Sequence, residues 1–351
     1  MDPLHNGPEP GAAIELARPN PDASAAVVWN EADFHLSEQT ARAIADGVPP
    51  NTAKAYTRQW AVFDAWCRDS GRTPLPATPH TLAEYTGHLC AADYAPASIE
   101  QAIAAVQTRH RISGYKGQPD TEAAGHVLAS HRLDRGRRGL RPVQARVLTR
   151  GDVRLMLETC DIETTEGLRD AVVISLGVKI MARQSMLSEL DIVDLEFVPD
   201  YGLIVHVLRS KTDQDAKGRE VTIPRGGDPR TDPTVLARTW IGRLESDYQI
   251  TEGPLLRACG RGGKIQHAGR LSENTVTRIM RRRAKAADVE GWEQVSGHTL
   301  RATGATLAAL AGMPAGLIAE HGGWSPTSPT VHQYIRAARR FEVNAMKGVD
   351  F

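Results

Sequence analysis

The stretch NTAKAYTRQWAVFDAWCRD, residues 51–69, carries the pattern that decides the fold of this chain. Its large apolar residues recur at spacings of four, three and four positions: Tyr56, Trp60, Phe63 and Cys67. That periodicity places them on one face of a helix. Pro49 and Pro50 precede the stretch and Gly71 follows it, and such residues commonly bound a helix. Because an apolar face of this kind must be buried, the sequence predicts a packed helical unit.

Helical patterns continue on the C-terminal side of this stretch. Two further helices are predicted to begin at Pro79 and Pro96, and a short one to span residues 121–132. On the other side, residues 1–37 are acidic and rich in proline and alanine, without a sustained apolar period, so they predict a disordered tail. Residues 38–134 are therefore predicted to form an all-helical domain.

A second domain is predicted to follow a basic linker. Residues 135–147 combine arginines with glycine and proline, which is typical of a linker. Apolar runs at residues 203–208 and 221–223 flank the polar segment 209–219 and predict a β-hairpin. The rest of residues 148–338 predicts helices, over about 150–160, 165–182, 234–248, 272–287, 298–311, 314–321 and 330–338. The expected fold class is mainly α, a two-lobed clamp with one small antiparallel sheet in its second lobe.

The composition of the 351 residues excludes several classes of protein. No apolar run approaches the ~20 residues of a membrane-spanning helix, and the N-terminus lacks the basic and apolar segments of a secretory signal. The four cysteines stand apart from one another, without the paired spacing of a zinc site or of a disulfide framework. A reduced, soluble, intracellular chain with no membrane contact and no bound metal is expected.

Charge is sorted into blocks, although the formal net charge is zero. Residues 131–150 hold seven arginines against one acidic residue, Asp134, and residues 255–285 hold nine lysines and arginines against Glu273. Residues 1–40 and 151–200 are acidic and balance them. One such block is commonly a solvated helix face. Two basic blocks, one of them between the predicted domains, favour a polyanionic partner such as a nucleic acid.

The C-terminal part of the chain holds three short motifs suited to phosphate chemistry. His298 and Arg301 lie at a predicted helix start, where free N–H groups suit an oxyanion. Gly297, directly before them, allows a backbone to approach closely. The small residues after Arg301 suit a helix packed tightly on a neighbour. A Gly-Gly-Trp sequence ends at Trp324, and Tyr334 falls in the last predicted helix. Each motif alone would be a weak signal.

Together these motifs resemble the tyrosine recombinase (phage integrase) family, and the Gly-Gly-Trp and Tyr-Ile-Arg spellings are most similar to its Cre recombinase branch. Residues 181–190 are similar to the helix that carries the family's first active-site arginine, which places it at Arg183. The sequence Arg-Ser-Lys-Thr at residues 209–212 resembles the family's catalytic-lysine turn, which gives Lys211. The resemblance extends over residues 38–345, and its helical part resembles the family's core DNA-binding domain.

The resemblance implies a site-specific recombinase that cleaves and rejoins DNA through a 3′-phosphotyrosine and a Holliday junction, without a metal or a nucleotide cofactor. Tyr334 would be the nucleophile, and Arg183 and Arg301 would bind the non-bridging phosphate oxygens. Three further catalytic residues are implied. Lys211 would protonate the departing 5′-oxygen, and His298 would assist proton transfer at the tyrosine. Trp324 would donate its indole N–H to the phosphate.

The same resemblance implies contacts with DNA and with further copies of the chain. The partner would be double-stranded DNA with an inverted-repeat target site, and the contacting residues would be Arg135, Arg137, Arg138, Arg141, Arg281, Arg282 and Arg283. Two strand exchanges on two duplexes need four active sites, which implies a tetramer on the DNA. Residues 339–351 would form a C-terminal helix exchanged with a neighbouring protomer. The expected location is cytoplasmic, at the nucleoid, for a protein encoded by a prokaryote, a phage or a plasmid.

Three positions depart from the family pattern or leave an alternative open. Met186 stands where the family usually has an acidic residue, so a DNA-binding protein of the same fold with weakened chemistry is an alternative. Lys179 offers a second register for the first arginine, although Arg183 aligns the following apolar residues better. His321 is expected to be an exposed residue at a helix end. A type IB topoisomerase, which shares the chemistry but needs no defined site, is a third possibility.

Overall fold

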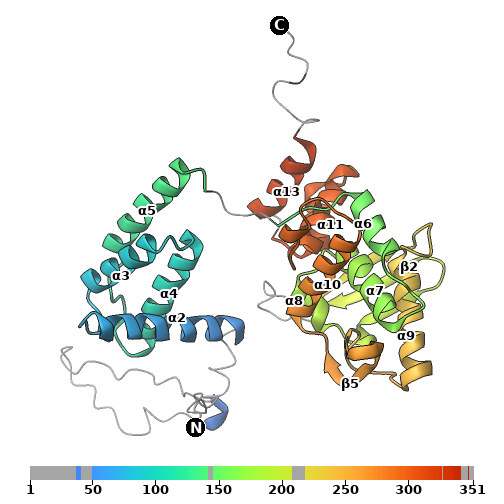
Figure 1. Ribbon diagram of the computed structural model, residues 1–351, viewed down its shortest axis with the longest axis horizontal. Helices are drawn as coiled ribbons and strands as arrows, with labels where there is room; N and C mark the ends of the chain where they lie inside the picture. The colour runs from blue at the N-terminus through green and yellow to red at the C-terminus, as the bar shows by residue number, and fades with distance from the viewer. Residues whose placement is uncertain are drawn as a thin grey trace. The chain divides into compact units, whose positions relative to one another are not determined.

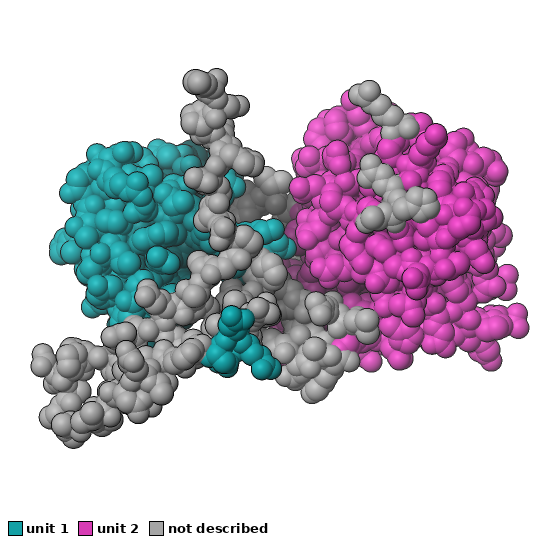
Figure 2. Space-filling model, turned by 90° about the horizontal axis from the view of Figure 1, so that it is seen from below, with its two compact units in different colours: residues 1–143 teal, residues 144–351 magenta. Residues whose placement is uncertain are grey.

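The computed structural model describes residues 37–40, 50–140, 145–207, 218–325, 327–340 and 347. The chain divides into two compact units, residues 1–143 and 144–351, shown as a ribbon in Figure 1 and in two colours in Figure 2. The predicted tail up to residue 36, Arg141, Lys211 and most of the predicted C-terminal helix of residues 339–351 lie outside the described residues. Within the described ranges, no helix is both long enough and apolar enough to cross a membrane.

Four long helices are described in the first unit: α2 (Pro50–Asp69), α3 (Pro79–Ala91), α4 (Pro96–Ile112) and α5 (Glu122–Arg137). Their shared core is rich in aromatic rings. Phe63 and Cys67 are fully buried on the predicted face of α2, and Trp60 is half-buried beside them. The Phe63 ring meets the Tyr85 ring of α3 edge-on, with 5.0 Å between the ring centroids. The packing confirms the apolar face that the sequence predicts for residues 51–69.

Helix α5 extends farther than the sequence predicts. Its end is expected near residue 132, with a linker from residue 135, but the helix continues to Arg137. The glycine at position 136 costs stability without ending the helix. Arg135 and Arg137 lie in the last turn, where cations interact favourably with the helix dipole. The helix ends where Gly139 adopts a φ of +72° and the Leu140 N–H donates to the Arg135 carbonyl at 2.9 Å.

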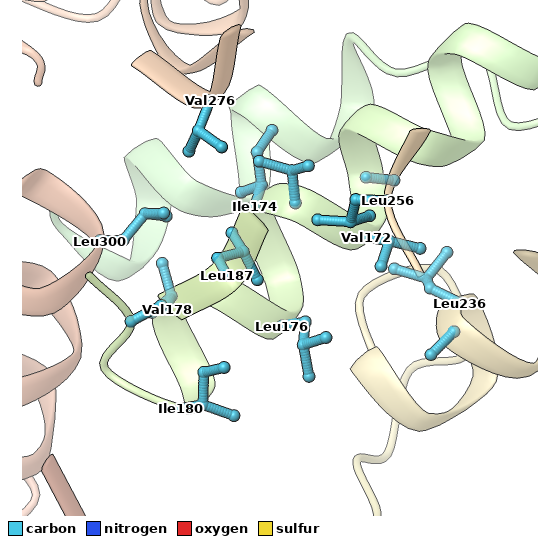
Figure 3. Close-up of a cluster of buried hydrophobic side chains, with 14 of the residues drawn as sticks. Val172, Ile174, Leu176, Val178, Ile180, Leu187, Leu236, Leu256, Val276 and Leu300 are labelled. Carbon is cyan, nitrogen blue, oxygen red and sulfur yellow. The ribbon is translucent and has the colours of Figure 1, made fainter. Parts of the chain in front are cut away.

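A central helix organises the second unit. The helices of this unit are α6 (Arg150–Glu158), α7 (Thr165–Lys179), α8 (Gln184–Glu189), α9 (Pro233–Tyr248), α10 (Glu273–Ala286), α11 (Thr299–Leu310), α12 (Ala315–Gly322) and α13 (Pro329–Arg339), with short 3-10 helices at Ile192–Asp194, Arg261–Gly263 and Trp292–Gln294. Helix α7 is buried over most of its length, and Figure 3 shows its apolar side chains among side chains from α8, α9, α10 and α11. A helix that is largely apolar on all sides requires such a position.

Two small antiparallel sheets are described in the second unit. The first contains β1 (Leu195–Val198), β2 (Gly202–Val207) and β3 (Arg219–Pro224) in the order β1-β2-β3, and the second pairs β4 (Arg257–Cys259) with β5 (Ile265–Arg270). The β2–β3 pair confirms the predicted hairpin, and Val205 lies opposite Val221 in it. Strands β1, β4 and β5 are not evident from the sequence, because β1 and β4 are very short and β5 has only one large apolar residue, Ile265.

The end of α7 packs closely against α11 and thereby prepares the functional site. A Cβ at Gly304 would lie 2.3 Å from the Val178 carbonyl oxygen, so the two helices could not approach this closely around a larger residue. Met181, two residues past α7, adopts a φ of +49°, and the Ala182 N–H donates to the Gly177 carbonyl at 2.9 Å. This left-handed turn ends α7. The next helix, α8, then packs against α10.

Candidate active site

Arg183 lies directly after the left-handed turn that ends α7. It caps the N-terminus of α8, with an extended backbone. Its side chain is half-buried, and burial lowers the pKa of its guanidinium, while the nearby Tyr334 phenol acts in the opposite direction. No carboxylate of the described residues contributes to its electrostatic environment.

Arg301 lies in the first turn of α11, and only 3% of its surface is exposed. Its Nη1 donates to the Met181 carbonyl at 2.9 Å, whereas Nη2 is buried without a hydrogen-bond partner among the described residues. Burial, together with the nearby Arg183 and Arg219 guanidinium groups, lowers the pKa of Arg301 to about 9. A buried cation with an unused donor is suited to bind an anion.

His298 lies directly before α11, one turn from Arg301, as the spacing of the motif predicts. Its side chain is exposed and makes no capping hydrogen bond to the helix. The sequence suggests that a backbone segment approaches Gly297 closely, but in the structure a side chain lies against this glycine. A Cβ at Gly297 would meet Gln184 Oε1 at 1.8 Å, so the residue after Arg183 fills the space that this glycine leaves.

The turn after α12 brings Trp324 onto Arg301. Gly323 ends α12 with a φ of +65°, and the Trp324 N–H donates to the Ala319 carbonyl at 2.8 Å. The guanidinium carbon of Arg301 lies 3.5 Å from the centroid of the Trp324 ring, which is a cation–π contact. The ring of Tyr334 lies 5.9 Å from the same indole. Arg301, Trp324 and Tyr334 are therefore in one cluster.

Tyr334 is half-buried on α13, which packs against α11. Burial raises the pKa of its phenol, and the Arg301 and Arg183 guanidinium groups lower that pKa again in part. Both arginines therefore favour the phenolate, which is the form of the side chain that attacks an electrophile.

A third arginine, which none of the motifs indicates, joins this cluster. Arg219, the first residue of β3, donates through Nη1 to the His321 carbonyl and through Nη2 to the Met186 sulfur at 3.5 Å. Burial, together with the nearby Arg183, lowers the pKa of Arg219 to about 10. In the sequence only its place at the edge of a predicted strand distinguishes it from the other polar residues of segment 209–219.

The structure also shows the surroundings of Met186, His321 and Lys179, the three positions that depart from the family pattern or allow another interpretation. Met186 is buried under the Arg219 guanidinium. His321 is half-buried, and its ring Nε2 hydrogen-bonds to the Lys179 carbonyl at 2.7 Å, so the expectation of an exposed histidine is wrong. The reason is that the end of α12 folds back onto the end of α7; burial lowers the pKa of His321. The Lys179 side chain is exposed, and it is Arg183 that lies near the phenol.

The arginines predicted to bind DNA from the first unit lie at the end of α5. Arg135 and Arg138 both form ion pairs with Asp93, at 2.7 and 3.0 Å. Arg137 is exposed to solvent. Their contact with DNA stays a prediction, as does that of Arg141, which lies outside the described residues.

The arginines of the second unit that are predicted to bind DNA lie on α10, where they form ion pairs and hydrogen bonds within the protein. Arg282 and Arg283 both bind the fully buried Asp170 carboxylate of α7, at 2.5 and 2.8 Å. Arg281 donates to the Val295 carbonyl at 2.7 Å. These contacts stabilise the packing of α10 on α7, and a role in DNA binding stays a prediction for these residues too.

Three guanidinium groups and one phenol therefore meet beside the end of α7. Arg183 lowers the pKa of both Arg219 and Arg301, Arg219 also lowers that of Arg301, and no carboxylate of the described residues offsets these charges. Within this cluster, Arg183 and Arg301 suit an anion with several oxygens, such as a phosphodiester, and would hold it near a nucleophilic phenol. Among the residues that the structure describes, no group of three His, Cys, Asp or Glu residues could hold a metal ion.

Comparisons with known proteins agree with this chemistry. The model of the phage integrase family matches residues 146–340. The chain is 29% identical over 322 residues to the integrase/recombinase xerD homolog of Selenomonas ruminantium, which covers 90% of both chains. It is 25% identical over 289 residues to the recombinase cre of Escherichia phage P1, which covers 80% of this chain and 81% of that protein. The likeness to the Cre branch is thus real, but weaker than that to the xerD homolog.

The fold is also similar to those of solved integrases. The Tn1549 transposon integrase in complex with transposon right end DNA gives a TM-score of 0.57 at 16% identity, covering 86% of this chain and 96% of that one. A lambda integrase dimer bound to a COC′ core site gives 0.55 at 18% identity, covering 86% and 94%. Because the family model spans more than half of the chain and includes Arg183, Arg301 and Tyr334, the chain belongs to the phage integrase family of tyrosine recombinases, enzymes of site-specific DNA recombination.

Proposed function

We propose that this chain cleaves and rejoins double-stranded DNA at a defined target site, with Tyr334 as the nucleophile. The observation that carries the proposal is the grouping of a phenol with Arg183 and Arg301, whose charges no carboxylate of the described residues offsets. A scissile phosphate would supply the missing negative charge and would then lie beside the phenol.

In the proposed reaction the Tyr334 oxygen attacks phosphorus while the bond from phosphorus to the 5′-oxygen breaks, which leaves a 3′-phosphotyrosine and a 5′-hydroxyl. The phenol proton leaves toward His298, and Lys211 protonates the departing 5′-oxygen. Attack of a 5′-hydroxyl on the phosphotyrosine reverses these steps and restores the DNA backbone. The bond energy is conserved in the covalent intermediate, so no nucleotide is consumed.

The phosphate is proposed to be held by the buried part of the site. The planar forks of Arg183 and Arg301 suit the non-bridging oxygens and would stabilise the additional charge of the pentacoordinate transition state. Trp324, which lies on Arg301, would donate its indole N–H to the same group. Removing one such donor typically costs ~10²–10³ in rate.

The proposed partner is double-stranded DNA with an inverted-repeat site, which the helical first unit and the second unit would both contact. Arg137 is the best placed of the predicted contact residues, because its side chain is exposed while Arg135 and Arg138 share Asp93. Solved relatives are described as bound to a core site and to transposon end DNA, which supports DNA as the partner. Since the similar proteins come from a bacterium and a phage, the proposed location is the bacterial cytoplasm, at the nucleoid.

A tetramer on DNA is proposed as the working assembly, with residues 339–351 exchanged between neighbours. A groove of about 900 Å³ in the second unit, lined by parts of α6, α7, β3, α11 and α12, offers a docking surface. Met313 and Leu317 in this groove are 43% and 51% exposed, which is high for apolar side chains. The C-terminal segment supplies apolar side chains of suitable size: Phe341, Val343, Met346 and Val349.

The function is tested on a target site that the protein itself selects. Duplexes retained from a random library, or an inverted repeat next to the gene, provide the site. A plasmid with two direct copies of it should be converted into two circles by the wild type, and by Tyr334→Phe not at all, although that variant should bind the site normally.

The alternatives predict different products. A DNA-binding protein with weakened chemistry would retain the selected duplexes and yield neither circles nor a covalent complex. A type IB topoisomerase would relax supercoiled plasmids that lack the site. Either result would overturn the assignment as a site-specific recombinase.

A further inference from the structure

Arg219 has no part in the chemistry described above, yet it lies in the middle of the site. Its two Nη atoms contact different elements: the His321 carbonyl at the end of α12, and the Met186 sulfur in α8, the helix that Arg183 caps. One side chain from β3 therefore bridges the two segments that carry Arg183 and Trp324.

The turn after α12 is shaped around this guanidinium. Gly323 has a φ of +65°, and a Cβ at this position would lie 2.7 Å from Arg219 Nε. Gly322 is equally closed, because a Cβ there would lie 1.8 Å from Trp324 Cζ3. Two successive glycines thus allow the turn to fit between the Arg219 guanidinium on one side and the Trp324 ring on the other.

The position of this turn decides where the indole lies. The Trp324 ring is 3.5 Å from the Arg301 guanidinium carbon and 5.9 Å from the Tyr334 ring. A shift of the turn would therefore move the indole relative to both the phosphate-binding arginine and the nucleophile.

We propose that Arg219 is a positioning residue of the strand-cleavage reaction: it fastens the turn of residues 321–323 to Met186 and so holds the Trp324 ring against Arg301 and Tyr334. This role rests on the recombinase chemistry proposed above. Both Nη atoms of Arg219 are used inside the protein, and its Nε, which has no hydrogen-bond partner among the described residues, faces Gly323 of the turn. In Arg301 it is Nη2, at the tip of the guanidinium, that has no such partner. That difference assigns the phosphate to Arg301 and the turn to Arg219.

The shape of the side chain is essential to this role. A planar guanidinium reaches two acceptors on different elements at once, whereas the single ammonium of lysine is a point charge on a flexible stem. Arg219→Lys should therefore fail to replace arginine although it keeps the positive charge. Arg225→Met is the matched control, because Arg225 is an exposed arginine just past the other end of the same strand.

The experiment measures single-turnover cleavage of a nicked suicide duplex, in which the cleaved strand cannot be rejoined. Arg219→Met and Arg219→Lys should cleave about 10²-fold more slowly, since a displacement of about 1 Å can cost that much. Their DNA affinity and thermal stability should match those of the wild type, and Arg225→Met should cleave like the wild type. Wild-type rates with Arg219→Lys, or equal losses of binding and cleavage, would overturn the role. Absence of a covalent complex with the wild type would instead refute the recombinase chemistry itself.

A double-mutant cycle shows whether Arg219 acts through Trp324. If it does, Arg219→Met should add little to the loss that Trp324→Ala causes alone, because the indole that it positions is already absent. Independent, multiplying losses would contradict this route. If Arg219→Met does not fold, the same cycle with Arg219→Lys decides.

A modified substrate separates positioning from direct contact with the phosphate. A methylphosphonate at the scissile position removes the charge that a contacting arginine would neutralise. The deficit of Arg219→Met should be as large on this substrate as on the normal duplex, whereas a deficit that disappears would show that Arg219 contacts the phosphate.

Discussion

At the scale of single residues, the buried charge of Arg301 destabilises the folded protein when no DNA is bound. The side chain is buried, and none of the described carboxylates offsets its charge. Its pKa is lowered to about 9, so the folded chain binds this proton less tightly than the unfolded chain does. The destabilisation is fully present below about pH 9 and fades as the pH rises above that value. A bound phosphate would relieve it at neutral pH.

Arg301→Met should therefore stabilise the DNA-free protein while it slows cleavage by about 10²–10³-fold. Loss of the unpaired buried charge should add about 1–3 kcal/mol to the free energy of unfolding. The lost hydrogen bond to the Met181 carbonyl should offset about 1 kcal/mol of that gain. Thermal melting at neutral pH should give a higher midpoint than the wild type, and Arg225→Met, which neutralises an exposed arginine, should leave the midpoint unchanged. A lower midpoint for Arg301→Met would mean that another group compensates the charge.

The pKa of the Tyr334 phenol should respond to the positive charges of Arg301 and Arg183. Burial raises its pKa, and the guanidinium groups of Arg301 and Arg183 lower that pKa in part. Arg183→Met and Arg301→Met should each raise the phenol pKa further, because each removes a cation that favours the phenolate. An NMR titration with ¹³Cζ-labelled tyrosine, assigned with Tyr334→Phe, measures the change. A pKa that stays constant or falls in both variants would separate the phenol from the arginines.

At the scale of secondary-structure elements, the site depends on how closely α11 lies on the end of α7. A Cβ at Gly304 would lie 2.3 Å from the Val178 carbonyl oxygen, a backbone atom that cannot yield without moving a helix. Gly304→Ala should lower the free energy of unfolding by about 1–3 kcal/mol. It should also slow cleavage, because Arg301 lies on the displaced helix.

Gly316→Ala on α12 is the matched control, since nothing lies within 4 Å of a Cβ at that position. It should leave stability unchanged or slightly raised, because alanine is the better helix former. Chemical denaturation compares the two variants. Equal stability of both would show that α7 and α11 are not held together as closely as Gly304 indicates.

How much of these elements the sequence predicts depends on where the deciding interactions lie. Helix α2 is predictable because Phe63 and Cys67 repeat at helical spacing within one segment. The end of α5 is not, because its basic, glycine-containing composition resembles a linker, while the helix ends only at Gly139. The residues of the active site likewise fall into those that the sequence predicts and those that it does not.

His298 and Arg301 could be found because one helix start carries both, and Tyr334 because its motif follows them. Arg219 and His321 could not, because their contact joins a strand to a turn 102 residues away. Long-range contacts of this kind leave no periodic pattern in a sequence.

At the scale of the whole molecule, the proposed exchange of C-terminal segments can be tested by truncation. Deleting residues 340–351, which follow α13, should spare binding to one arm of the target site and abolish cooperative occupancy of the second arm. Recombination should be lost with it. Gel-shift titrations on one-arm and two-arm duplexes measure both effects.

A groove variant provides the complementary test of the exchange. Leu317→Glu should reproduce the defect of the truncation, because it places a charge in the groove proposed to receive the segment. Val193→Glu, at an apolar side chain that is 82% exposed and does not line the groove, should leave cooperativity intact. Cooperative binding by the truncated protein would locate the assembly contacts elsewhere.

The most direct measurement identifies the residue that becomes joined to DNA. The wild type is incubated with a nicked suicide duplex of its selected site, denatured with SDS, digested with protease and analysed by mass spectrometry. A nucleotide linked through phosphate should be found on the peptide that contains Tyr334, and Tyr334→Phe should bind the duplex without forming any SDS-resistant complex. A nucleotide on another residue, such as Tyr248, whose hydroxyl lies 3.2 Å from Thr165 Oγ1, or a covalent complex with Tyr334→Phe, would contradict the account.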